Sequence, residues 1–171
     1  MIDDDDNTLS SKPEGDISIA SYAELHDITL AMTRPSKRQL DIISRSLEPA
    51  VYDARDFLDA VKNMILTRRG KVRIVVLDPG TLISRKDHRF VEMVTHLSSY
   101  MEIRKPGEHH AEFNEAMFIA DRQMVVYQKH SDRYEGMANF NAPRLAASLT
   151  ENFDTIWQHS VTIPDFRRLM L

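Results

Sequence analysis

The chain has 171 residues, of which 42% are hydrophobic and 28% are charged, a composition ordinary for one soluble globular domain with its own core. It contains no cysteine, which excludes disulfides, thiolate zinc sites and iron–sulfur clusters. No apolar run approaches the ~20 residues that a membrane span needs, and the acidic N-terminus does not resemble a signal peptide, so we expect a cytoplasmic bacterial protein.

The negative charge is concentrated at the N-terminus. The first sixteen residues hold six carboxylates and one lysine, so residues 17–171 carry +1 of the total charge of −4. Residues 1–17 are therefore predicted to be a disordered acidic tail, followed by a single α/β domain over residues 18–171. An alternative role for the tail is to compete with nucleic acid for a basic face. The nearly neutral body argues against a dedicated DNA-binding domain.

The predicted elements alternate between helix and strand. In chain order they are a helix from Ser21 to Pro35, strand 39–44, helix 53–69, strand 72–77, helix 87–99, strand 101–104, strands 116–120 and 123–127, and helix 142–159. Ser21 and Glu24 form a capping box. Asp53, Asp87 and Asn141 are predicted to cap later helices. Strand 72–77 is almost entirely apolar, which predicts burial on both faces.

Two strand-to-helix junctions resemble one another. Glu48-Pro49 follows the strand at 39–44, Asp78-Pro79 follows the strand at 72–77, and a helix follows each pair. Two such units in succession predict one α/β sheet with helical crossovers between its strands. A simpler interpretation is that the two prolines only mark strand ends.

The most informative stretch begins at Asn114. It reads Asn-Glu-Ala-Met-Phe-Ile-Ala-Asp as far as Asp121, then Gly-Met-Ala-Asn at 136–139, and then an amphipathic helix that includes Trp157. This order resembles the phospholipase D-like superfamily, whose motif is His-x-Lys, four residues and Asp, followed by Gly-Ser/Thr-x-Asn and a closing helix. The resemblance implies a three-layer α-β-α sandwich with a central mixed sheet.

Two residues of that motif are replaced. Asn114 stands in place of the histidine and Ala116 in place of the lysine, whereas Asp121 is kept. The resemblance implies that the histidine would form a covalent phosphoryl intermediate and the lysine would stabilise phosphate charge. An asparagine amide is not a usable nucleophile, so we expect no catalysis by this mechanism. Met137 also replaces Ser or Thr, and its element lies further from Asp121 than is usual in the family.

The remaining polar residues define a candidate site. We expect Asn114, Asp121 and Asn139 to meet at the C-terminal edge of the sheet, with arginines supplying positive charge. His88 lies among cations at a predicted helix start, where an anion would bind, although a solvated helix start is the alternative. The candidate ligand-binding residues are Asn114, Asp121, Asn139, Arg45, Arg85, His88 and Arg89.

Asp121 has two interpretations. As part of a residual site, its carboxylate should accept a hydrogen bond from a backbone N–H, from Asn114 or Asn139, or from Arg122, because a buried unpaired carboxylate is costly. Alternatively, Asp121-Arg122 is an ordinary turn between two hairpin strands.

Together these observations predict a catalytically inactive phospholipase D-like domain that binds a phosphate-bearing ligand, a nucleic acid or a protein partner. No cofactor or metal site is predicted, and the chain lacks the glycine patterns of dinucleotide and P-loop sites. The resemblance also implies a homodimer, since single-motif members bring two motifs together. The alternatives are an active phosphodiesterase or phosphatidyltransferase that uses His88 or His110, and a purely structural subunit of a larger assembly.

Two further segments have simpler interpretations. The basic run within residues 68–73 follows a predicted helix, and the helix dipole alone explains it. The segment after Ser160 is too apolar to be free, so Phe166, Leu169 and Leu171 are predicted to pack on the body or on a partner.

Overall fold

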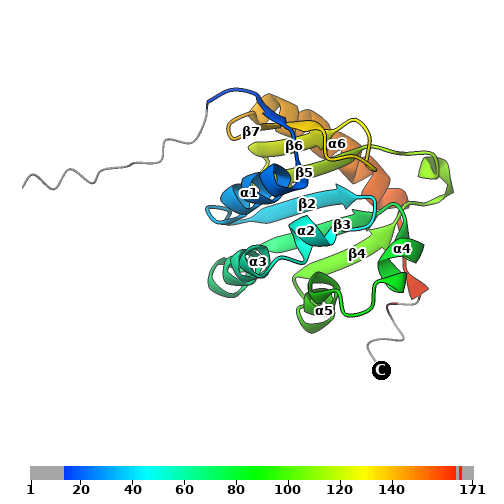
Figure 1. Ribbon diagram of the computed structural model, residues 1–171. Coiled ribbons are helices and arrows are strands. Elements are labelled where there is room, and N and C mark those ends of the chain that lie inside the picture. The colour runs from blue at the N-terminus through cyan, green and yellow to red at the C-terminus, as the bar shows by residue number, and fades with distance from the viewer. Residues whose placement is uncertain (1–13, 165, 167–171) are drawn as a thin grey trace, which may run out of the picture.

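The computed structural model describes residues 14–164 and 166, which form one eight-stranded sheet between two helical layers (Figure 1). The elements are β1 (Ile17–Ile19), α1 (Tyr22–Thr33), β2 (Gln39–Ser44), α2 (Pro49–Tyr52), α3 (Arg55–Arg68), β3 (Lys71–Val76), α4 (Pro79–Ser84), α5 (Arg89–His96), β4 (Met101–Lys105), the 3₁₀-helix η1 (Glu108–His110), β5 (Ala116–Ala120), β6 (Met124–Gln128), β7 (Gly136–Asn139), α6 (Pro143–His159) and β8 (Val161–Thr162). The predicted α/β sandwich is confirmed, with all five predicted strands in one sheet.

The sheet is mixed, and its strand order is β1-β7-β6-β5-β2-β3-β4-β8. The strands β2, β3 and β4 are parallel, while β5 runs antiparallel to β2 and continues into the antiparallel strands β6 and β7. The two parallel crossovers pass through α2–α3 and α4–α5, as the paired strand-to-helix junctions predict. Pro49 and Pro79 are the first residues of α2 and α4.

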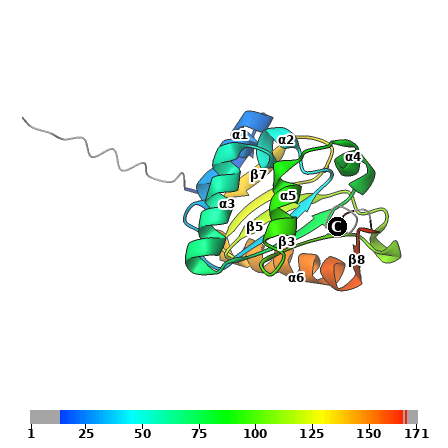
Figure 2. The same ribbon diagram turned by 90° about the horizontal axis from the view of Figure 1, so that it is seen from below.

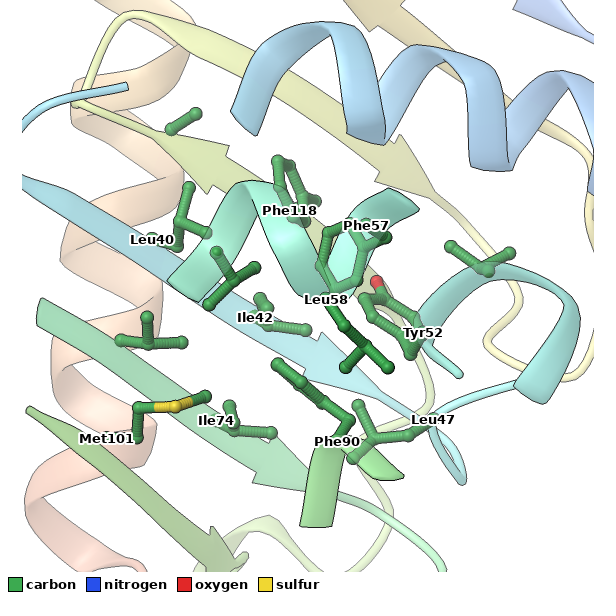
Figure 3. Packing of buried hydrophobic residues seen from close by; sticks show 14 of the residues in the cluster. Leu40, Ile42, Leu47, Tyr52, Phe57, Leu58, Ile74, Phe90, Met101 and Phe118 are labelled. Carbon is green, nitrogen blue, oxygen red and sulfur yellow. The ribbon is translucent and has the colours of Figure 1, made fainter. Parts of the chain in front are cut away.

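Seen from below, α6 alone covers one face of the sheet, and the other helices cover the opposite face (Figure 2). Between β2, β3, β5 and the larger helical layer lies the larger core, in which aromatic side chains pack beside Ile42 (Figure 3). The ring of Phe57 lies 5.5 Å from Tyr52, 5.6 Å from Phe90 and 6.5 Å from Phe118. Burial raises the pKa of the Tyr52 phenol.

Three predicted helix caps are wrong. The short helix α2 ends at Asp53, so Asp53 does not start α3; its carboxylate instead accepts a hydrogen bond of 3.1 Å from Arg89 N, at the start of α5. Asp87 has a φ of 67° and precedes His88, which is the residue that caps α5. Asn141 lies one residue before Ala142, the N-cap of α6, and its N–H donates to the side-chain oxygen of Asn139. The capping box is confirmed, because Ser21 Oγ accepts from Glu24 N.

The helix α3 ends on a residue in the left-handed conformation. Arg69, and not Gly70, adopts the left-handed conformation, with a φ of 55°. Gly70 is needed for a different reason: a Cβ there would come within 2.9 Å of the Met64 side chain.

The predicted docking of the C-terminal segment is confirmed where the structure describes it. The strand β8 pairs with β4, and Ile163 and Phe166 are buried in the larger core. Leu169 and Leu171 lie outside the described residues, as does most of the predicted tail. Of the predicted tail, residues 14–17 are described, and Ile17 is the first residue of β1. Within the described chain, no helix is long and apolar enough to cross a membrane.

Candidate phosphate-binding site

The carboxyl edge of the sheet carries a cluster of three polar side chains. Because β5 runs antiparallel to β2, Asn114, just before β5, lies beside Arg45, just after β2. Arg45 Nη2 donates to Asn114 Oδ1, and Arg45 Nε donates to Ser131 Oγ at 3.0 Å. The Ser131 hydroxyl in turn donates to Asn114 Oδ1 at 2.6 Å. We call these residues the Arg45–Asn114–Ser131 cluster.

A second arginine lies near this cluster. Arg85 Nη1 donates to both the carbonyl and the hydroxyl of Ser46, at 3.1 Å each. Asp78 lies close to both Arg45 and Arg85. Its pKa is lowered, first by the hydrogen bonds from the Thr81 hydroxyl and N–H and then by the two arginine charges, while burial acts in the opposite direction. Asp78 is thereby held as the ionised cap of α4.

Arg45 keeps donors for a ligand. It forms no ion pair with any residue that the structure describes, and it is half-buried, so its guanidinium is positioned but not neutralised by a contacting carboxylate. Asn114 is exposed, so the cluster opens to solvent. The remaining guanidinium donors suit the oxygen atoms of a phosphate or carboxylate.

Asp121 lies at the other end of β5. With φ values of 52° and 54°, Asp121 and Arg122 are the two central residues of the turn closed by the bond from Gln123 N to the Ala120 carbonyl, in the three-residue loop between β5 and β6. The Asp121 carboxylate accepts backbone hydrogen bonds from Lys37 and Arg38, at 2.8 Å each, and from Gln39 at 3.0 Å. The expected bond to a backbone N–H is confirmed, and so is the turn. The aspartate anchors the loop that enters β2.

The predicted meeting of Asn114, Asp121 and Asn139 is therefore wrong. The strand β5 separates Asn114 from Asp121 by seven residues, which at about 3.3 Å per residue is roughly 20 Å. Asn139 ends β7 and binds Asp16 at 2.9 Å. The physical reason is that an extended strand places the residues at its two ends on opposite edges of the sheet.

The other candidates are held by local structure. His88 is buried, and its Nε2 donates to the Leu47 carbonyl at 2.9 Å, while Nδ1 has no partner among the described residues. Arg89 pairs with Asp53 at 2.9 Å. His110 lies in η1, four residues before Asn114, and its ring lies 5.6 Å from that of His159. Among the described residues, neither histidine forms a hydrogen bond with the Arg45–Asn114–Ser131 cluster.

The sequence analysis missed Ser131. This residue follows β6, and its N–H also donates to the Asn114 carbonyl at 2.8 Å. One signal in the sequence was available. The Gly-x-x-Asn element lies further from Asp121 than is usual in the family, so a polar residue nearer to Asp121 could be expected beside Asn114. Among the described residues, no group of three histidine, aspartate or glutamate side chains is arranged to hold a metal ion.

Solved structures share this fold. TrmBL2, an archaeal chromatin protein described as showing a novel mode of DNA binding, aligns with a TM-score of 0.66 and 15% identity over 91% of this chain, which spans 56% of TrmBL2. The phospholipase D family member Nuc from Salmonella typhimurium aligns at 0.61 and 16%, over 87% of this chain and 97% of its own. NucT from Helicobacter pylori aligns at 0.58 and 14%, over 87% and 99%.

The fold is therefore that of the phospholipase D-like proteins. Residues 21–169 match the family described as Domain of unknown function (DUF7931), and the chain belongs to that family. No curated protein matches the sequence.

Proposed function

We propose that this domain is a catalytically inactive phospholipase D-like binding module, which holds a phosphate-bearing ligand at the Arg45–Asn114–Ser131 cluster. The observation that supports it is the position of Asn114. The residue that replaces the motif histidine is exposed at the carboxyl edge of the sheet and is fixed there by hydrogen bonds from Arg45 and Ser131.

The absence of catalysis follows from the side chains at the two replaced positions. The Asn114 amide is no nucleophile, and its oxygen already accepts two hydrogen bonds. Ala116 is buried and offers no charge to a phosphate. In other enzymes, loss of one electrostatic contact to the transition state lowers the rate by about 10²–10³. Here both the nucleophile and the cation are missing.

Binding requires less than catalysis. Arg45 supplies a charge that no described carboxylate pairs with, and the Ser131 hydroxyl holds it in place by accepting from Nε. Arg85 adds a second guanidinium on the same edge, although Ser46 and, at 3.9 Å, Glu48 share its donors. The structural similarity to TrmBL2, which is described as showing a novel mode of DNA binding, supports a binding function for this fold. A nucleic acid is then one possible phosphate-bearing ligand.

The test uses bis-p-nitrophenyl phosphate as both ligand and substrate. We expect binding without hydrolysis, and about tenfold weaker binding to Arg45→Gln, because a charge-assisted hydrogen bond contributes roughly 1.5–3 kcal/mol. Arg55→Gln is the matched control, since Arg55 is exposed on α3 and the substitution removes the same charge. Its affinity should equal that of the wild type.

Two results would contradict the proposal. Hydrolysis that survives Asn114→Ala but is lost in His88→Ala would identify an enzyme with a rearranged site. Equal affinity of Arg45→Gln, Arg55→Gln and the wild type would show that the cluster is not the binding site, and would favour a structural subunit.

A further inference from the structure

The amino edge of the sheet, opposite the Arg45–Asn114–Ser131 cluster, gathers cations from three separate parts of the sequence. We call this surface the basic edge. It consists of Lys37, Arg38, Arg68, Arg69, Lys71 and Arg122.

Hydrogen bonds show that these segments lie together. Asp121, the neighbour of Arg122, accepts from the backbone of Lys37 and Arg38. Lys71 N donates to the Arg38 carbonyl at 2.9 Å, because β2 and β3 start side by side. Arg68 Nη1 donates to the Ser36 carbonyl at 2.9 Å. In Figure 1 the amino ends of β2 and β3 lie together at the left.

The charge of the basic edge is not neutralised locally. None of its six side chains forms an ion pair with a described residue. Two carboxylates at this edge are already engaged: Asp121 accepts three backbone N–H groups, and Asp41, which is 1% exposed, is bound by Arg73. Residues 17–171 together carry only +1, so the remainder of the body is net negative.

The helix dipole explains only part of this cluster. Arg68 lies in the last turn of α3 and Arg69 caps it, as the dipole favours. Lys37, Lys71 and Arg122 lie outside the helices, in a loop, at a strand start and in a hairpin turn, beyond the last helical turn in which the dipole acts most strongly.

Two of the arginines occupy backbone positions that suit glycine better. Arg69 has a φ of 55° and Arg122 a φ of 54°, in the left-handed region where side chains other than those of glycine, asparagine and aspartate are disfavoured. The second position of this hairpin turn in particular favours glycine. Strained positions that keep a charged side chain are a reason to look for a function of that charge.

A cavity of about 600 Å³ opens beside the basic edge. Lys71 and Arg122 line it, together with Arg73, Tyr100 and Trp157. The carboxylates of Glu102 and Asp154 also line it, but Glu102 pairs with Arg104 and Asp154 pairs with Arg73. Trp157 is the single tryptophan of the chain, so its fluorescence reports on ligands at this end of the molecule.

We infer that the basic edge binds the sugar–phosphate backbone of a nucleic acid. Four of its six cations are arginines, whose planar donors match phosphate oxygens, and contacts of this kind bind without regard to base sequence. A lipid surface would require apolar side chains among the cations. Of the described residues, only Leu66 adds an exposed large apolar side chain near this edge. The inference does not rest on the proposed function, because the length of the sheet separates the two sites.

The experiment measures binding of the full-length protein to a fluorescein-labelled DNA duplex by anisotropy, over a series of salt concentrations. The test variant is Arg69→Gly/Arg122→Gly, which removes two cations at positions where glycine is well accommodated. The matched control is Arg55→Gln/Arg133→Gln, which removes two exposed arginines, one at the start of α3 and one after β6, both away from the amino edge of the sheet.

We expect the test variant to bind DNA at least tenfold more weakly at low salt, with the slope of log K against log salt smaller by about 2, since each phosphate contact contributes about 0.9. The affinity of the control variant for DNA should lie within about twofold of that of the wild type, because its two cations lie away from the basic edge and do not contact the phosphates. Lys37→Gln/Arg38→Gln, whose exposed side chains make no contact that folding needs, should repeat the effect. DNA should also change the Trp157 fluorescence of the wild type.

Several outcomes would overturn the inference. They are no DNA binding by the wild type, equal losses in the test and control variants, or binding to phosphatidylserine vesicles but not to DNA. DNA binding that Arg45→Gln abolishes and both basic-edge variants keep would place the nucleic acid at the Arg45–Asn114–Ser131 cluster. That result would end this inference while supporting the proposed function.

Discussion

Asp121, the one motif residue that this chain keeps, has a structural role. Its carboxylate fixes the loop before β2 through three backbone hydrogen bonds. Asp121→Asn keeps the shape and suits the left-handed backbone, but it turns an amide donor toward these N–H groups. We expect a loss of about 2 kcal/mol in the free energy of unfolding. Urea titration measures it, and the exposed Asp59→Asn serves as the control, with an effect below about 0.5 kcal/mol.

The buried carboxylate of Asp41 depends on one arginine. Asp41 is 1% exposed, and Arg73 binds it through Nε at 2.8 Å and Nη2 at 3.0 Å. Removing the cation with Arg73→Met leaves an uncompensated buried carboxylate, and we expect a loss of about 3–5 kcal/mol in unfolding experiments.

Asp154, on α6, also binds Arg73 but is 41% exposed. Asp154→Asn should therefore lose less than about 1 kcal/mol. Similar losses from the two substitutions would show that burial does not determine the strength of this network.

Among the secondary-structure elements, α1 and α3 are joined by His26. Its Nε2 lies 2.7 Å from Asp56 and its Nδ1 3.0 Å from Asp27. Burial lowers the pKa of His26, but the hydrogen bonds to the two carboxylates outweigh it and raise the pKa overall. Protonated His26 therefore stabilises the fold fully below its unfolded pKa of about 6.5, and this contribution is lost as pH rises through the higher folded pKa.

We expect His26→Gln to be less stable than the wild type by about 0.5–1 kcal/mol at acidic pH, because both carboxylates are partly exposed. The difference should shrink as the pH rises through the raised pKa of folded His26. The pKa of Asp56 is lowered, chiefly by the same hydrogen bond, so Asp56 stays ionised throughout this range. Parallel thermal melts measure the difference, with His96→Gln, on the exposed face of α5, as the control.

For the whole molecule, the C-terminal segment completes the sheet and the larger core. Deleting residues 161–171 removes β8 together with Ile163 and Phe166, which are 4% and 7% exposed. We expect a lower melting temperature, with Phe166→Ala alone losing about 2–4 kcal/mol. Leu66→Ala, at a side chain 60% exposed, is the control and should change stability little. A truncated protein that melts like the wild type would show that this segment contributes no stability.

The sequence alone determined the central sheet. The strands at 39–44 and 116–120 were predicted with the bounds that β2 and β5 have. Short, mostly apolar runs between charged and turn residues favour buried strands over helices, because helices are longer. The long helices were found for the same reason, through their apolar faces. The short elements α2, α4, β1, β7 and β8 were not predicted, since two to six residues carry too little pattern of their own and form only against neighbours.

Only the tertiary structure decided which polar residues meet. The motif suggested that Asn114 and Asp121 share a site, but an extended strand carries them to opposite edges, and the sheet pairs them instead with Arg45 and with the backbone of Lys37. The basic run at 68–73, which the helix dipole explains when taken alone, acquires partners from β2 and from the hairpin turn through strand pairing. Long-range pairing is a property of the whole sheet, and no local stretch of sequence contains it.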